Sequence, residues 1–186
     1  MKIIITILFL SLLSSPSWSQ TFDDLVERDG VYYKKFSDVP FSGKVTGLHK
    51  GSIKNGKKEG KWVGYWSTGK LNYKGDYKNG KKEGKWVSYW SNGKLNYKGS
   101  IKNGKKEGKW VSYWSNGQLE TKGNWKNDKK HGYFAYYDSD GSIFKNHSGH
   151  YNNGVKFDWQ TNHAINYETK TPHTTSNNIS TGSTSK

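Results

Sequence analysis

Apolar and polar residues alternate along the middle of the chain in a pattern that recurs every 24 residues. The motif Gly-x-x-Lys-Asn-Gly-Lys-Lys-Glu-Gly-Lys-Trp-Val-x-Tyr-Trp-Ser-x-Gly begins at Gly51, Gly75 and Gly99, and a diverged copy begins at Gly123. Alternation of this kind is typical of β-strands that bury one face. A period in the range of about 20–50 residues predicts an array in which each unit buries its apolar side against its neighbours. We therefore expect four repeats, at residues 51–74, 75–98, 99–122 and 123–146.

Turn dipeptides divide each repeat into two strands. Asn92-Gly93 and Asn103-Gly104 are typical of type I′ hairpin turns, in which both central residues need a positive φ. If both turns have two residues, the 24-residue period leaves two strands of ten residues. The pairs predicted from this register are Trp90 with Leu95, Ser88 with Tyr97, Trp86 with Gly99, Tyr97 with Trp110, and Ile101 with Lys106.

The same register gives the glycines that begin the repeats a role. Gly99 lies opposite Trp86 in the predicted sheet, and a missing side chain leaves room for the indole. Gly75 faces Trp62 in the same way, and Gly123 faces Trp110.

The two faces of the predicted sheet differ in chemistry. One carries Trp86, Trp90, Leu95, Tyr97, Ile101, Trp110 and Trp114. The other carries Lys94, Lys98, Lys102, Lys105, Glu107 and Lys109, with Val87 and Tyr89 among them. The candidate binding residues are the aromatic stripe Trp62, Trp66, Trp86, Trp90, Trp110, Trp114, Tyr73 and Tyr97. The stripe has two interpretations: it forms only the core, or its open part binds a ligand by stacking.

The predicted fold is all-β, an extended single antiparallel meander of β-hairpins. Each repeat advances the sheet by two strand spacings, about 10 Å, so four repeats span on the order of 40 Å. Strand twist is expected to curl the sheet into a trough. Residues 20–50 read as an N-terminal capping segment and residues 147–160 as C-terminal capping strands. Residues 161–186 are rich in Ser, Thr and Asn and are predicted to be disordered.

The first 19 residues have the features of a cleaved secretory signal peptide. Lys2 precedes an apolar run from Ile3 to Leu13, and Ser17-Trp18-Ser19 places small residues at the −3 and −1 positions of a cleavage site. The alternative is a membrane anchor, for which the run is short of the roughly 20 residues that span a bilayer. We expect an exported bacterial protein, either periplasmic or secreted.

Composition limits the chemistry that the chain performs. The formal net charge is +15, almost all of it from lysine, because Arg28 is the single arginine. A lysine-rich surface attracts anionic partners with little geometric selectivity, and it also favours solubility. Cysteine is absent, which excludes disulfides, thiol nucleophiles and cysteine-bound zinc.

Fragments that suggest catalytic or metal sites have simpler explanations in the repeat. The segment Gly64 to Lys70 approaches a phosphate-binding P-loop, but Leu71 replaces the required Ser or Thr, and the repeat makes Thr68-Gly69 a turn. Asp138-Ser139-Asp140-Gly141 resembles the start of a calcium loop and coincides with the next turn.

Acidic and histidine side chains do not form a catalytic set in the predicted fold. Glu59, Glu83 and Glu107 occupy one repeat position and balance local lysine charge. His131, His147, His150 and His163 lie in strand and turn segments, where the spacing of three places His147 and His150 on opposite faces. We expect no catalytic, cofactor-binding or metal-binding residues and no enzymatic activity.

The repeat resembles a known family. The residues Gly-Ser-Ile-Lys-Asn-Gly-Lys-Lys-Glu-Gly-Lys-Trp from Gly99, preceded by Tyr97-Lys98, resemble the MORN repeat with its Tyr-x-Gly-x-Trp-x-Asn-Gly-x-x-x-Gly core. The continuation Trp-x-x-Tyr-Trp-Ser-Asn-Gly-Lys-Leu is similar to the bacterial MORN-repeat variant, which occurs in YwqK-type antitoxins. The resemblance covers residues 25–158 and implies hairpins in a row, a role in binding and no catalytic residues. A signal peptide departs from the simple role of neutralising a cytosolic toxin.

A second resemblance covers one repeat. Residues 132–142, from Gly132 to Ser142, are similar to the wall-binding repeats of Gram-positive surface proteins, which hold choline or glucan between aromatic rings. The other three repeats carry the Lys-Asn-Gly-Lys-Lys-Glu-Gly block that fits the MORN variant better.

Two binding functions follow as hypotheses. The first is an exported, non-enzymatic scaffold that binds an unidentified protein partner; an immunity or antitoxin-like role is one form of this function. The second is an envelope module that binds anionic lipid or cell-wall glycan through the lysine face or the aromatic trough. Export argues against nucleic acid as the natural partner.

Overall fold

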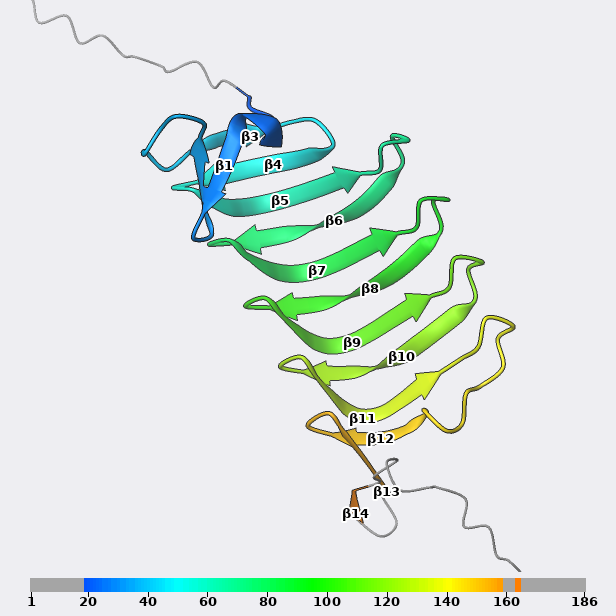
Figure 1. Cartoon of the computed structure of the whole chain (residues 1–186). Helices are drawn as coiled ribbons and strands as arrows, with labels where there is room; N and C mark the ends of the chain where they lie inside the picture. Colours follow the sequence, from blue (N-terminus) through cyan, green and yellow to red (C-terminus); the bar gives the residue numbers. More distant parts are fainter. Residues whose placement is uncertain (1–18, 159–162, 165–186) are drawn as a thin grey trace, which may run out of the picture.

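The computed structural model describes residues 19–158 and 163–164, and these form an almost entirely β structure (Figure 1). Twelve strands, β3 to β14, make one sheet in which each strand pairs antiparallel with the next in the chain. A short 3₁₀ helix and a separate β1–β2 hairpin precede this sheet. The predicted all-β meander is therefore confirmed. The predicted signal peptide and C-terminal tail lie almost wholly outside the described residues.

The elements follow one another along the chain with short connections. They are η1 (Phe22–Asp24), β1 (Leu25–Arg28), β2 (Val31–Lys34), β3 (Gly43–Val45), β4 (His49–Lys54), β5 (Lys57–Tyr65), β6 (Leu71–Lys78), β7 (Lys81–Tyr89), β8 (Leu95–Lys102), β9 (Lys105–Tyr113), β10 (Leu119–Lys126), β11 (Lys129–Tyr136), β12 (Gly149–Asn152), β13 (Val155–Asp158) and β14 (His163–Ala164). No helix among the described residues is long and apolar enough to cross a membrane.

The two turns of a repeat differ in type. Asn103 and Gly104 both have positive φ, 52° and 82°, as the type I′ prediction requires. In Asn92-Gly93 only the glycine has a positive φ, 91°, and its N–H donates to the Trp90 carbonyl at 2.8 Å. This is a three-residue loop closed by a glycine bulge, so the predicted two-residue turn is wrong there.

Strands β5, β7, β9 and β11 each contain a β-bulge that the alternating sequence pattern did not predict. Gly108 has a φ of 68°, and the β8–β9 register shifts between Lys98 and Ser100. Tyr97 consequently pairs with Ser112, and the predicted Tyr97–Trp110 pair is wrong. The longer loop also replaces the predicted Trp90–Leu95 pair with Tyr89–Leu95. The other predicted pairs are confirmed: Ser88 with Tyr97, Trp86 with Gly99, and Ile101 with Lys106. Because the bulge adds two residues to one strand, side chains beyond it keep their faces.

The glycines that begin the repeats do make room for indoles, but for those of the following strand. Gly99 pairs across the sheet with Trp86, yet a Cβ at Gly99 would lie 2.2 Å from Cδ2 of Trp110. Gly75 lies under Trp86 in the same way, and Gly123 lies under Phe134. The prediction assigned the indole of the preceding strand, and the bulge explains the error because it moves Trp110 over the glycine.

Hydrogen bonds join each repeat to the next at both ends of the strands, where the turns form two rows; we call these rows the type I′ edge and the longer-loop edge. At the type I′ edge, Glu83 accepts from the backbone N–H of Asn103 at 2.8 Å, and Gly104 N–H donates to the Lys82 carbonyl at 2.9 Å. At the longer-loop edge, the indole N–H of Trp90 donates to the Tyr113 carbonyl at 2.9 Å. The same contacts recur one period away, so the glutamate at this position has a structural role.

The N-terminal segment covers one end of the aromatic face. Leu25 of β1 and Phe41 are buried in one cluster with Val45, Ile53 and Trp62, and Phe22 packs against this cluster. Figure 1 shows β1 crossing in front of the first strands of the large sheet. A second buried cluster of Trp86, Ile101 and Trp110 begins further along the array. We call η1 with the β1–β2 hairpin the cap, and it closes the aromatic face over repeat 1.

Candidate functional site

A row of lysines lies among the rings of the aromatic face. The second residue of strands β5, β7, β9 and β11 is Lys58, Lys82, Lys106 and Lys130 respectively, one per repeat, and we call these four the lysine ladder. Each Nζ lies over the ring of the core aromatic four residues later, at 5.0 Å for Trp62, 4.4 Å for Trp86, 4.7 Å for Trp110 and 5.3 Å for Phe134. Such cation–π contacts stabilise an ammonium that is partly out of water.

Two effects disfavour the charged form of the ladder lysines Lys58, Lys82 and Lys106. Burial lowers the pKa of Lys58, Lys82 and Lys106 below the usual 10.5, because it disfavours the charged form. The positive charge of the next ladder lysine lowers each of these pKa values further. Glu27 of the cap opposes the shift at Lys58, and Asp128 opposes it at Lys106.

Acidic partners for the lysines are scarce in the structure. Among the described residues one ion pair lies within 4.0 Å, between Arg28 and Asp38. Lys82, whose pKa no acidic neighbour in the described part of the chain raises, therefore presents positive charge that an anionic group from another molecule would neutralise.

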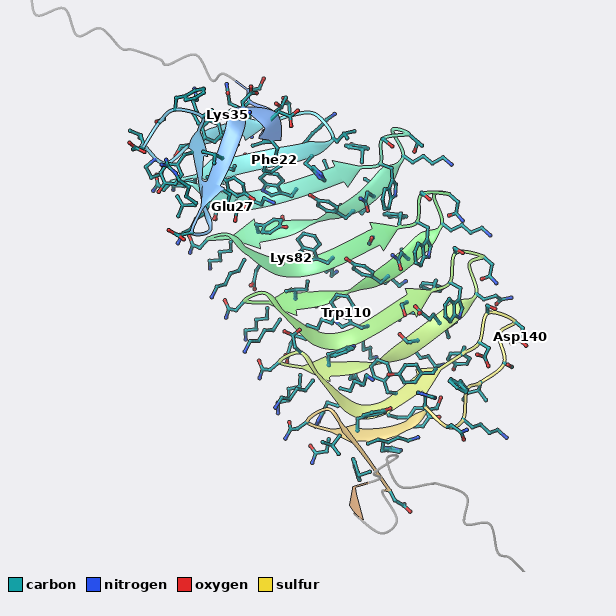
Figure 2. All side chains as sticks on the ribbon, in the orientation of Figure 1. Phe22, Glu27, Lys35, Lys82, Trp110 and Asp140 are labelled. Carbon is teal, nitrogen blue, oxygen red and sulfur yellow. The ribbon has the colours of Figure 1, made fainter. Side chains whose placement is uncertain are left out.

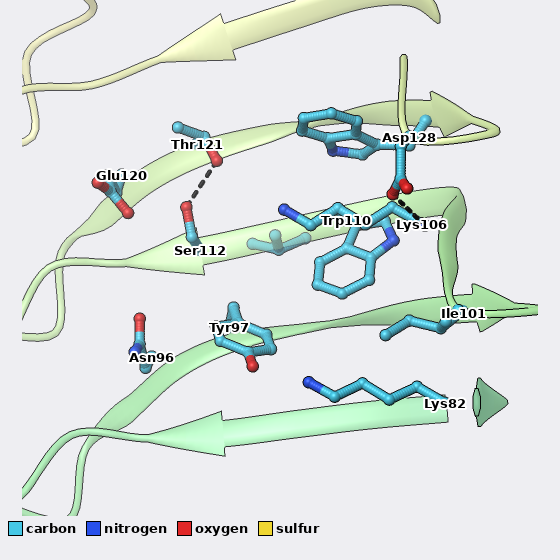
Figure 3. Close-up of a pocket in the computed structure, with 13 residues that line it drawn as sticks. Lys82, Asn96, Tyr97, Ile101, Lys106, Trp110, Ser112, Glu120, Thr121 and Asp128 are labelled. Carbon is cyan, nitrogen blue, oxygen red and sulfur yellow. Dashed lines mark hydrogen bonds between the residues drawn. The ribbon is translucent and has the colours of Figure 1, made fainter. Parts of the chain in front are cut away.

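A hollow of about 470 Å³ lies on the aromatic face between Lys82 and Lys106 (Figure 3). Its aromatic lining comes from Tyr97, Trp110 and Trp125. Ligand pockets in proteins are commonly about 300–1,000 Å³ and combine apolar walls with a few polar groups. Here the polar groups are two ammonium groups, the Asn96 amide, the Ser112 and Thr121 hydroxyls, and the Glu120 and Asp128 carboxylates.

The polar groups of the hollow are held in place by neighbours. The hydroxyls of Ser112 and Thr121 lie 2.6 Å apart and share a hydrogen bond across β9 and β10. Asp128 accepts from the Lys106 backbone N–H at 2.6 Å, which fixes the carboxylate beside the ladder. The arrangement offers stacking surfaces, cations and hydroxyls, and it suits binding.

The eight predicted aromatic residues fall into three groups. Trp62, Trp86 and Trp110 are buried, with 2%, 2% and 6% of their surface exposed, so their rings are core. Trp66, Trp90 and Trp114 are half-buried in the longer loops and donate their indole N–H to the next repeat. Tyr73 and Tyr97 are half-buried, with ring centroids 5.7 Å from Trp86 and 5.6 Å from Trp110. The structure thus brings Tyr97 and Trp110 together at the hollow, while the loop tryptophans form a separate row.

Sequence reasoning missed the ladder and Trp125. The predicted register did place Lys106 opposite Ile101, hence on the aromatic face, and that signal identifies the ladder. Trp125 occupies the position of Ile101 one period later, so the same alignment places it beside the hollow.

The opposite face carries exposed lysines in regular rows. Lys74 pairs with Val63 on one side and Val87 on the other, and Lys98 lies between Val87 and Val111 in the same way. Lys61, Lys85 and Lys109 form a second exposed row. At the type I′ edge, Lys102 and Lys105 are directly paired across the turn, and so are their equivalents Lys54 with Lys57, Lys78 with Lys81, and Lys126 with Lys129.

The fragments that suggested catalysis have structural roles. The segment from Gly64 to Lys70 is the end of β5 followed by a hairpin loop, which is closed by a 2.8 Å bond from Trp66 N–H to the Lys70 carbonyl. The Tyr73 ring fills the space at Gly64. Asp140 accepts from the Ser142 N–H at 2.8 Å within a turn, and these bonds lower the pKa of Asp140.

The histidines contact aromatic rings. His147 stacks on Phe144 with centroids 4.2 Å apart, and His150 meets Tyr133 edge-on at 5.3 Å. Within the part of the chain that the structure describes, no three His, Cys, Asp or Glu side chains are grouped to hold a metal ion.

Comparison with known proteins identifies the repeat. No curated protein matches the chain. Three segments, residues 58–79, 82–103 and 106–127, match the model of the MORN repeat variant, and each begins at a ladder lysine and ends at the asparagine of the next type I′ turn. The hairpin array around the hollow therefore consists of three consecutive MORN-variant repeats.

Proposed function

We propose that this protein is an exported, non-enzymatic scaffold that binds another protein along the open part of its aromatic face. The supporting observation is the hollow between Lys82 and Lys106, where aromatic rings and half-buried ammonium groups lie together beyond the reach of the cap. Trp and Tyr side chains are among the residues that carry most of the binding energy at protein interfaces.

The repetition of the lysine ladder along the aromatic face favours a macromolecular partner over a single small ligand. The ladder repeats every 24 residues, or about 10 Å along the sheet, so equivalent groups recur over a length that an extended protein surface matches. The net charge of +15 favours a partner with acidic groups.

An immunity or antitoxin-like role is the form of this function that the resemblance to YwqK-type proteins supports. The signal-peptide pattern of residues 1–19 supports a partner in the envelope or outside the cell. The N-terminus of the mature protein, determined by mass spectrometry after expression in a bacterium, tests export. Gln20 is the expected first residue, and retention of Met1 in the cytosol contradicts it.

Affinity capture from envelope extracts tests the scaffold. The mature protein is immobilised beside two charge-reversed variants, Lys82→Glu with Lys106→Glu, and Lys85→Glu with Lys109→Glu. The second variant is the matched control, because it makes the same change in charge on the same two strands but at exposed residues of the other face. A partner lost with the first variant and kept with the second supports the proposal. Equal loss with both, or no protein captured, contradicts it.

A second candidate function is adsorption to an anionic envelope surface, lipid or cell-wall glycan. The observation that favours it is the pair of exposed lysine rows, which no ion pair neutralises among the described residues. Flotation with vesicles of phosphatidylglycerol and phosphatidylcholine over a salt series tests it, since adsorption to a charged surface weakens as salt rises. Here the Lys85→Glu, Lys109→Glu variant is expected to lose more binding than the Lys82→Glu, Lys106→Glu variant.

A further inference from the structure

The cap shows how a polypeptide occupies the aromatic face over repeat 1. Two rings of the cap, Phe22 and Tyr32, lie 5.0 Å and 5.6 Å from Nζ of Lys58. Phe22 also packs against Trp62, with ring centroids 5.8 Å apart. Figure 2 shows Phe22 and Glu27 at this end of the face, with Lys82 and Trp110 further along the array.

A carboxylate accompanies these two rings. Glu27 pairs directly with Tyr32 across the β1–β2 hairpin, so it lies beside the ring that approaches Lys58. Its charge also raises the pKa of Lys58 against the effect of burial. Burial, together with the negative charge of Glu27, raises the pKa of Tyr32. The cap therefore supplies three groups to repeat 1: two aromatic rings and one acid.

The surface that lies beneath the cap recurs in the next two repeats, where no segment of the cap covers it. Translation by 24 residues carries Lys58 and Trp62 onto Lys82 and Trp86, and then onto Lys106 and Trp110. Two rings of the sheet, Trp62 and Tyr77, lie around Lys58, and two, Trp110 and Trp125, lie around Lys106. The cap rings have no counterpart above the later repeats within the described chain, where the hollow lies instead.

We propose that the open repeats bind a protein segment that imitates the cap, presenting two aromatic side chains and a carboxylate to Lys82 and Lys106. This inference rests on the proposed scaffold function and names the chemistry of its partner. The hollow of about 470 Å³ accepts two rings, and because Asp128 already lies beside Lys106, the carboxylate of the segment contributes mainly at Lys82. A purely anionic surface leaves the aromatic walls unused, which is why a peptide fits better than a lipid headgroup or a charged polymer.

The cap sequence itself is the probe. A peptide of residues 20–37, cyclised through cysteines added at its two ends to reduce the cost of ordering, is labelled with a fluorophore and added to the mature protein. Binding is measured by fluorescence anisotropy. The Lys82→Met, Lys106→Met variant is expected to weaken binding by at least about fivefold, since it removes both cations. The Lys85→Met, Lys109→Met variant is the control and is expected to bind like the unmodified protein.

Peptide variants separate this mode from simple charge attraction. Replacing Phe22 and Tyr32 of the peptide by alanine, or Glu27 by glutamine, is expected to weaken binding. A peptide without its rings that binds equally well points to anion binding alone and overturns the inference. Absence of binding, or equal loss with both protein variants, also overturns it.

Cross-linking of the unmodified protein does not depend on the folding of any variant. A carbodiimide condenses a peptide carboxylate with a lysine amine to form an amide with loss of water, and mass spectrometry locates the link. Links from Glu27 to Lys82 or Lys106 are expected. Links to Lys58 alone mean exchange with the native cap and contradict the proposal. If capture depends on Lys82 and Lys106 while the peptide does not bind, the scaffold function stands and this inference fails.

Discussion

The carboxylate of Glu83 accepts a hydrogen bond from the backbone N–H of Asn103, with 2.8 Å between Oε2 and N. The two residues lie 20 positions apart and belong to successive hairpins, so the glutamate fixes the start of the next turn. Glu59 and Glu107 make the same contact at 2.8 Å and 3.0 Å. A residue that reads in sequence as a local charge balance is therefore a joint between repeats.

Removing this joint is expected to lower stability. Glu83→Ala leaves the Asn103 N–H without its carboxylate and is predicted to cost about 1 kcal/mol of unfolding free energy, measured by urea denaturation. Glu83→Gln is the control, because its carbonyl oxygen still accepts the bond. Equal stability of the alanine variant and the parent protein rejects the role.

The glycine beneath Trp110 is predicted to be among the least replaceable residues. A Cβ at Gly99 lies 2.2 Å from the indole, so Gly99→Ala should displace a buried ring and cost about 3 kcal/mol or prevent folding. Gly108→Ala is the comparison, since that position is open but has a φ of 68°, and a strain of about 1 kcal/mol is expected. Urea unfolding of the two variants decides, and a smaller loss for Gly99→Ala refutes the packing argument.

Like charges across the type I′ turns store unfavourable energy. Lys102 and Lys105 are paired directly, and replacing one by an acid should turn repulsion into attraction. Lys105→Glu is expected to stabilise the protein by about 0.5 kcal/mol at low salt, and the gain should shrink at high salt. The stability of Lys105→Gln, which removes the repulsion alone, should lie between those of the parent protein and Lys105→Glu. A gain that does not depend on salt argues for another cause.

Acid sensitivity is predicted at the boundary between the cap and repeat 1. Burial and the charge of Lys58 lower the pKa of His49 below 6.5, and its ring stacks on Tyr73. The unfolded chain binds the proton more tightly than the folded protein, so stability is complete above pH 6.5 and falls as the pH drops through the lowered folded pKa.

The repeat supplies a matched variant for this test. Tyr73 and Tyr97 occupy the position of His49 in the next two repeats, so His49→Tyr places a native-like ring there without a titrating group. Thermal unfolding between pH 7 and pH 5 should show a smaller decline for His49→Tyr than for the parent. Identical pH profiles exclude His49 as the cause.

Much of the fold could be predicted from the repeat, because a strict period of 24 residues fixes both the number of hairpins and the faces of the strands. The type I′ turn at Asn103-Gly104 was recognisable since the dipeptide and the register agree. Asn92-Gly93 was misleading, because the same dipeptide also ends a longer loop in which the Trp90 carbonyl accepts from Gly93. The dipeptide alone does not distinguish the two turns.

The site was less predictable than the fold. The glycine at Gly108 is itself the sequence signal for the bulge, but alternation alone does not reveal it, and the bulge decides which indole covers Gly99. Lysines usually lie on the exposed face, so composition alone does not mark Lys82 and Lys106 as members of a site, although their register places them among the rings. Half-burial of a lysine over tryptophan depends on the three-dimensional stacking of strands, which one repeat read alone does not reveal.

The cap covers the ladder over one repeat and leaves the following repeats uncovered, so under the proposed docking mode the valency of the array rises with its length. Duplication of a 24-residue unit would add one equivalent docking position without disturbing the cap, because each repeat contacts mainly its neighbours. Weak individual contacts then combine when a partner carries several matching segments. Affinity for such a partner is thus adjustable by repeat number, in steps set by the period, with no change to the chemistry of any single site.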